Sequence, residues 1–189
     1  ERIQYTLHQA GENSSELKKV LDHYQNQPEK LKAARFLIAN IPAHRTYVGK
    51  EIDSLKQMKK ESIQQGRISD EIVTHWKSFD YSSSQVVKDI DVIKADILIE
   101  NIDLAFETWE KRSWSKQYSF EDFCEYVLPY RIGDEPLEKW RRIYYERYSP
   151  VLDSLYQGND VVEAARVMAN YLKEEGFTNH TDFNLPHLG

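Results

Sequence analysis

Two rows of apolar residues run in parallel through residues 85–111, and this pattern constrains the fold more than any other feature of the chain. The first row is Ile90, Ile93, Ile97 and Leu104, and the second is Leu98, Ile102, Ala105 and Trp109. One apolar row is typical of a surface helix, whereas two rows require burial over a wide arc. We therefore expect a long central helix over about residues 85–111, with the other elements packed around it.

The rest of the chain predicts further helices and almost no strand. Helical spacing of apolar residues recurs over residues 50–65 and 161–175, and no alternating strand pattern longer than about five residues appears. The few glycines and prolines lie mostly at the ends of predicted elements, as an α-rich protein requires. The fold expected is all-α, an irregular multi-helix bundle. Residues 1–189 should form a single helical domain, with a possible internal boundary near residues 80–85.

Residues 119–148 predict two helices joined by a tight elbow. Ser119 can cap the first helix, because its hydroxyl oxygen can accept a free backbone N–H. Pro129 is expected to end that helix, and Pro136 suits the first turn of the next one. Residues 130–135 between the two prolines would form the elbow.

Aromatic and charged side chains are interleaved along this elbow and the helix after it. Rings with polar tips suit a core, a sugar-stacking surface or a protein interface. Arginine–carboxylate pairs can rigidify an elbow or hold a neighbouring domain. The candidate inter-domain contact residues are Tyr130, Arg131, Glu135, Trp140 and Arg141. The alternative is that Arg131 bonds to Glu135 or to carbonyl groups at the end of the first helix.

The sequence carries no recognisable motif for catalysis, metal binding or cofactor binding. Cys124 is the only cysteine and falls on the apolar face of a predicted helix, which indicates a buried structural thiol. His180, Asp182 and His187 are at most a loose metal site, because no zinc-binding spacing is present. Acidic pairs such as Glu121 and Glu125 leave a glycosidase as an alternative. We predict no cofactor, no metal and no catalytic activity for this chain.

Charge and hydropathy bear on two classes of partner. The formal net charge of -6 argues against a general nucleic-acid binder, which needs a basic surface. The sequence contains no run of about 18 apolar residues, so we predict no transmembrane helix. The sequence begins at Glu1 and ends in an apolar run over residues 183–189. We expect that it is part of a longer protein from which any targeting peptide has been removed.

The run over residues 120–141, FEDFCEYVLPYRIGDEPLEKWR, resembles a segment of bacterial transglutaminase-like proteins. In these multidomain, exported proteins of gut bacteria, a helical region precedes a domain of papain-related fold. Residues 98–106 together with Trp109 are similar to the same region, and residues 183–189 look like the lead-in to the catalytic domain. The resemblance covers about the second half of the chain, from Asp89 onward.

This resemblance implies a non-catalytic, N-terminal accessory or scaffold domain that contacts a downstream papain-like domain of the same polypeptide. It also implies export to the cell envelope or the extracellular space. Cys124 does not occupy the position of the family's nucleophile, so no catalytic residue carries over. The alternative function is an aromatic-rich module that binds a glycan or a peptide. A surface groove lined by several rings would favour this alternative, and complete burial of the rings would favour the scaffold.

Overall fold

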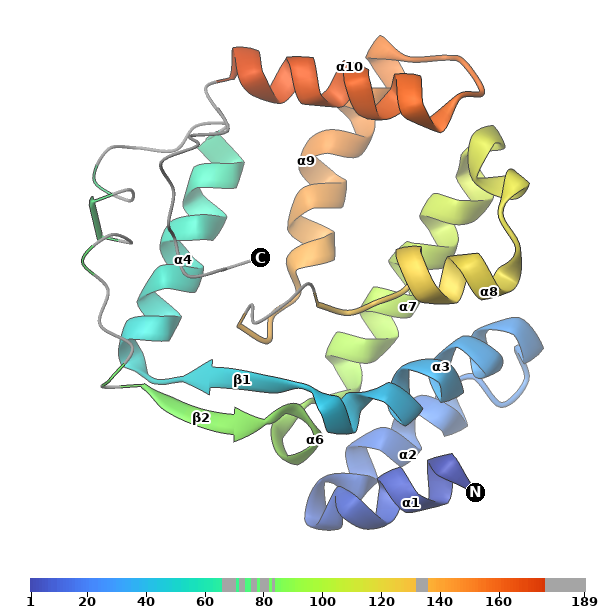
Figure 1. Ribbon diagram of the computed structural model, residues 1–189, viewed down its shortest axis with the longest axis vertical. Coiled ribbons are helices and arrows are strands. Elements are labelled where there is room, and N and C mark those ends of the chain that lie inside the picture. The colour runs from blue at the N-terminus through green and yellow to red at the C-terminus, as the bar shows by residue number, and fades with distance from the viewer. Residues whose placement is uncertain are drawn as a thin grey trace.

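The computed structural model describes residues 1–65, 71, 74, 75, 78, 82, 84–131 and 136–175. Within these residues the chain is mainly helical, with one small two-stranded sheet (Figure 1). The prediction of an all-α, multi-helix fold is confirmed. No helix in the described part of the chain has both the length and the apolar character that crossing a lipid bilayer requires.

The elements follow one another in a simple order. The α-helices are α1 (Arg2–Gln9), α2 (Ser14–His23), α3 (Pro28–Asn40), α4 (Lys50–Gln65), α6 (Asp89–Val92), α7 (Ala95–Lys111), α8 (Phe120–Asp122), α9 (Trp140–Leu155) and α10 (Val161–Glu174). Short 3-10 turns are η1 (Gly11–Asn13), η2 (Ile41–Ala43) and η4 (Ser113–Gln117), and a π-helical turn is η5 (Phe123–Val127). The strands are β1 (Arg45–Val48) and β2 (Gln85–Lys88).

The core forms where α2 and α3 pack against α7. The completely buried residues here include Leu17 of α2, Ile38 of α3, and Leu98 and Ile102 of α7. Helix α7 also contacts α9, and α9 in turn contacts α10, which lies at the opposite end of the molecule from α1 and α2 (Figure 1). The central position expected for this helix is therefore observed, and α7 connects the N-terminal helices with the C-terminal pair.

The predicted bounds of the central helix are wrong at its N-terminal end. Residues 85–88 form β2, which pairs antiparallel with β1, and α7 begins only at Ala95. The reason is a contact from far away in the sequence: the Asn13 side-chain amide donates to the carbonyl oxygens of Ile90 and Ile93, at 3.0 and 2.9 Å. In a continuous α-helix these two carbonyls would instead accept the backbone N–H groups four residues later. Ile90 and Ile93 are nevertheless buried, as their place in the apolar row predicts.

The predicted elbow pair is confirmed at its start and corrected at its second helix. The Ser119 hydroxyl accepts the backbone N–H of Asp122 at 3.1 Å, and the Asp122 carboxylate accepts the backbone N–H of Ser119. Pro136 does not lie in the first turn of a helix, because α9 begins only at Trp140. The segment before α9 is held elsewhere, since the backbone N–H of Leu137 donates to the Thr46 hydroxyl of β1 at 3.0 Å.

The strand pairing also bears on domain organisation. It joins residues 45–48, which precede the possible boundary near residues 80–85, to residues 85–88, which begin where that boundary region ends. Residues 132–135 of the elbow lie outside the described residues. The single-domain organisation stays a prediction.

Candidate functional site

The apolar faces of α9 and α10 are less completely covered than those of the core helices. Ser149 is the one buried residue among the described residues of α9, and Ala164 is the one in α10. Helix α9 nevertheless carries a row of large aromatic side chains, of which Tyr144 is 37% exposed. Contiguous aromatic area that stays partly exposed is typical of a binding surface.

A groove lies between α9 and the neighbouring elements α7, η4 and α10. It has a volume of about 220 Å³, and five of its eleven described lining residues are aromatic, which are Trp114, Trp140, Tyr144, Tyr145 and Tyr148. The remaining lining residues are Thr108, Arg112, Arg141, Ser149, Leu152 and Met168. We call this site the aromatic groove. Most of its lining comes from one face of α9, on which positions 141, 145, 148 and 152 recur at helical spacing.

The rings of the aromatic groove are held in place by their own contacts. The Trp140 indole N–H donates to the Tyr130 carbonyl at 2.6 Å, and the Tyr145 hydroxyl donates to Glu107. Tyr144 packs between Trp140 and Tyr148, with ring centroids 6.0 Å away on each side. Rings that are positioned in advance lose little conformational freedom when a ligand binds.

The Tyr145 and Tyr148 hydroxyls of the groove wall are uncharged near neutral pH, and burial extends this neutral state to higher pH. Burial raises the pKa of the Tyr148 hydroxyl to about 12, with the Glu175 carboxylate as a second cause. It also raises the pKa of Tyr145, as does the hydrogen bond to Glu107. Both hydroxyls therefore stay protonated near neutral pH.

The two arginines of the aromatic groove differ in their partners. Arg112 donates to the Ser149 hydroxyl at 2.8 Å and forms an ion pair with Asp153. Arg141 donates from Nε to the Asn101 side-chain oxygen at 2.9 Å, and from Nη2 to the carbonyls of Val127 and Pro129 at 2.6 and 3.1 Å. Desolvation lowers the pKa of Arg141 to about 10. Arg141 thus secures the end of η5 against α7 through neutral acceptors.

Tyr130 and Arg131 from the elbow turn into the protein. Both are buried and converge on Asp89: the Tyr130 hydroxyl donates to Asp89 Oδ2 at 2.8 Å, and Arg131 Nη1 lies 2.7 Å from the same oxygen. Arg131 also donates to the backbone carbonyl of Arg45 in β1. Burial and the Asp89 charge raise the pKa of the Tyr130 hydroxyl. These contacts join the elbow to β1 and α6. The alternative considered from the sequence was that Arg131 bonds to Glu135 or to carbonyl groups at the end of the first helix, whereas the partners named here are Asp89 and the Arg45 carbonyl.

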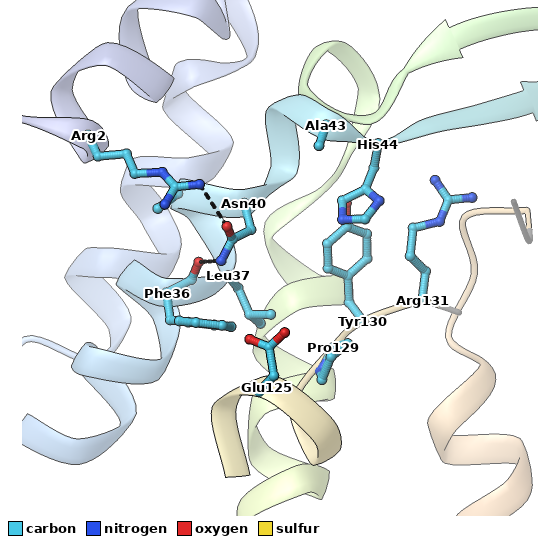
Figure 2. Close-up of a pocket in the computed structure, with 11 residues that line it drawn as sticks. Arg2, Phe36, Leu37, Asn40, Ala43, His44, Glu125, Pro129, Tyr130 and Arg131 are labelled. Atoms are coloured by element: carbon cyan, nitrogen blue, oxygen red, sulfur yellow. Dashed lines mark hydrogen bonds between the residues drawn. The ribbon is translucent and has the colours of Figure 1, made fainter. Parts of the chain in front are cut away.

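A second cavity of about 520 Å³ lies beside the elbow, between α3 and η5 (Figure 2). Figure 2 shows the Tyr130 ring beneath His44, and their centroids are 5.7 Å apart in an edge-to-face contact. Across the cavity, Arg2 donates to Asn40, which donates to the Phe36 carbonyl, each at 2.9 Å. Four polar side chains of this cavity thus have partners, because Arg2 bonds to Asn40, and Tyr130 and Arg131 bond to Asp89. We take the aromatic groove as the candidate site, because none of the described residues accepts a bond from Nη1 of its Arg141.

The structure separates the predicted contact residues into two groups. Trp140 and Arg141 line the aromatic groove, Tyr130 and Arg131 lie inside the fold, and Glu135 lies outside the described residues. A role for these residues in contacting another domain stays a prediction. Sequence reasoning missed Trp114 and Arg112, both from the turn that follows α7. A tryptophan directly after a long amphipathic helix was the available signal for the first.

Other predicted chemistry can be placed as well. Cys124 is buried as expected, and burial raises the pKa of its thiol to about 11, with Glu121 and Glu29 adding to the effect. The Asn101 side-chain amide donates to the Leu128 carbonyl at 2.7 Å. No three His, Cys, Asp or Glu side chains of the described residues gather in a way that could hold a metal ion. His180, Asp182 and His187 lie outside the described residues.

Comparison of the chain with protein-family models, with curated proteins and with solved structures found no match.

Proposed function

We propose that this chain is a non-catalytic binding domain that holds a short apolar peptide segment in the aromatic groove. The observation that supports it is the groove itself: five aromatic rings line an open site on the otherwise half-covered helix pair α9 and α10. Tyrosine and tryptophan are the residues that supply most contact energy in protein interfaces. A scaffold whose rings were all buried would offer no such surface.

The chemistry of the wall favours a peptide over a glycan. A sugar presents hydroxyl groups on several sides, and each needs a polar partner when it leaves water. The polar side chains of the aromatic groove are largely engaged: the Thr108 hydroxyl donates to the Leu104 carbonyl at 2.8 Å, and Arg112 bonds to Ser149. Apolar side chains of a peptide make no such demand. The groove volume of about 220 Å³ suits one large side chain, since sites for whole drug-sized ligands measure roughly 300–1,000 Å³.

The resemblance of residues 120–141 supports a second, compatible proposal about context. The chain would be the accessory domain of an exported transglutaminase-like protein, and the peptide segment would belong to its downstream papain-like domain. This proposal rests on the resemblance and adds nothing to the chemistry of the groove. A longer reading frame that encodes cysteine, histidine and aspartate in papain-like order after residue 189 would support it, and a frame without them would count against it.

Peptide selection from a random library displayed with free C-termini tests the proposed function. We expect selected peptides to share an apolar side chain and to bind the purified chain but not the Tyr144→Ala variant. Tyr126→Ala is the matched control, because Tyr126 is 79% exposed and lies outside the aromatic groove. Peptides that bind both variants equally, or a selection that enriches nothing, would refute a peptide site here. Glycans that bind the wild type and are lost in Tyr144→Ala would establish the alternative.

A further inference from the structure

The aromatic groove contains a positive charge that no carboxylate of the described residues pairs with. Among those residues, its lining includes two guanidinium groups and no acidic side chain. The charge of Arg112 is matched by Asp153. Arg141, in contrast, bonds to one amide oxygen and two backbone carbonyls, and none of the described residues supplies it with a carboxylate. A partly desolvated cation with neutral acceptors alone favours an anion that arrives with a ligand.

Arg141 also keeps donor capacity for such an anion. A guanidinium group carries five N–H donors. The three hydrogen bonds that Arg141 donates to described residues use its Nε and Nη2 groups, and none of those residues accepts a bond from Nη1. The Cζ atom lies 4.8 Å from the centroid of the Trp140 ring, so the charge stands directly against the aromatic wall. An anion at Nη1 would therefore lie beside a surface for an apolar group.

We propose that the aromatic groove binds the C-terminal carboxylate of a peptide whose last side chain is apolar, with Arg141 Nη1 as the donor to the carboxylate and the rings as the pocket for the side chain. This inference rests on the proposed peptide-binding function and specifies its ligand. A chain end fits better than an internal segment. The small cavity has room for about one large side chain, and a terminal residue presents a carboxylate and a side chain on the same carbon.

The direct test uses the wild-type chain and two probes that differ only in charge, N-acetyl-glycyl-glycyl-phenylalanine and its C-terminal carboxamide. Binding is followed by calorimetry and by tryptophan fluorescence, because Trp114 and Trp140 line the groove. We expect the acid to bind at least tenfold more tightly, as a charge-assisted bond to a carboxylate provides. Raising the ionic strength from about 0.05 to about 0.5 M should weaken binding of the acid and leave the affinity for the amide unchanged.

The outcomes separate this inference from the proposed function. Equal affinities for acid and amide overturn the carboxylate subsite and leave an apolar peptide groove. Failure of both probes overturns the subsite and counts against the groove as a peptide site. An internal peptide, N-acetylated and amidated with aspartate next to phenylalanine, that binds as tightly as the acid overturns the assignment to a chain end.

A pair of adjacent variants adds a residue-specific test. Arg141→Gln should lose the preference for the acid, whereas Arg142→Gln should keep it. Arg142 is the matched control because it lies next in α9 and pairs with Glu100, away from the aromatic groove. If Arg141→Gln loses its fold, shown by circular dichroism, the comparison of acid and amide on the wild type still decides. Retention of the acid preference in a folded Arg141→Gln variant would overturn the role of Arg141.

Discussion

Asp89 and Arg131 form a buried ion pair, with 2.7 Å between Oδ2 and Nη1 and side chains that are 0% and 2% exposed. The pair connects α6 with the elbow, and Tyr130 donates to the same carboxylate oxygen. Two charges removed from water are costly, and their attraction offsets this cost only while both remain in place. The elbow is therefore positioned by a charge that lies in another part of the sequence.

Removal of the Asp89 charge should be severely destabilising. Asp89→Asn leaves the Arg131 guanidinium buried without its counter-charge, so we expect a loss of about 3–5 kcal/mol in the free energy of unfolding. Asp96→Asn is the control, because Asp96 pairs with Lys139 at the surface, with side chains 64% and 41% exposed. An exposed pair contributes about 1 kcal/mol or less. Urea unfolding measures both, and equal losses would contradict the buried-pair interpretation.

Asn101 should be nearly as sensitive, because it holds two partners at once. Its amide donates to the Leu128 carbonyl, and its side-chain oxygen accepts from Arg141. Asn101→Ala leaves an acceptor and a charged donor without their partner, which should cost about 2–4 kcal/mol. Asn26→Ala, at an exposed position, should change stability by about 0.5 kcal/mol or less. Thermal unfolding of the two variants side by side decides, and a mild Asn101→Ala would show that water can replace both bonds.

The Glu16 carboxylate should stabilise the fold in a pH-dependent way. It accepts the backbone N–H of Ala95 at 2.9 Å, at the N-terminus of α7. This hydrogen bond, followed by Lys19, lowers the pKa of Glu16 below its ordinary value of 4.5. The unfolded chain thus takes up the proton first on acidification, so the contribution is present above pH 4.5 and is lost below it.

Comparison of Glu16→Gln with wild type at two pH values tests this sign. The variant should be less stable at pH 7, and the difference should shrink as the pH falls below 4.5, because protonation of the wild-type carboxyl removes its charge. Glu12→Gln is the control, because its side chain is exposed. A difference between Glu16→Gln and wild type that stays constant with pH would show that charge is not its cause.

The Cys124 thiol should be unreactive in the folded chain. It is 3% exposed, and burial raises its pKa to about 11 from the ordinary value of 9. The thiolate is the reactive form, so alkylation by iodoacetamide at pH 8 should be at least tenfold slower in native buffer than in urea. Because the unfolded thiol ionises first as the pH rises, stability linked to this group falls between about pH 9 and 11. Rapid labelling of the native chain would contradict a structural role for this thiol.

The same residue tests the non-catalytic proposal. Peptidase or acyl-transfer activity of the purified chain that is lost in the Cys124→Ala variant would contradict it.

Local signals were sufficient for the parts of the fold that depend on neighbouring residues. The helix predicted over residues 50–65 is observed as α4, which has the same bounds. The Ser119 cap forms as expected. The burial of Cys124 also followed from its place on an apolar face. Capping residues and apolar spacing act within one or two turns, so they can be read without knowledge of the tertiary structure.

Contacts between distant residues decided the rest. The predicted helix over residues 85–111 is interrupted before Ala95, because Asn13, 77 residues from Ile90, bonds to two of its carbonyls. The start of α9 depends on Thr46, 91 residues from Leu137. Neither break has a local signal, because Asn13 and Thr46 are ordinary polar residues in their own segments.

The candidate site divides in the same way. Sequence spacing placed Trp140 and Arg141 together near an elbow, since adjacent residues of one helix must be close. Tertiary packing brought Trp114 from the turn after α7 onto the same groove and turned Tyr130 and Arg131 toward Asp89. The sequence thus determined which residue types were available in each helix. Only the tertiary structure decided which charges found partners, because pairing depends on where segments far apart in the chain meet.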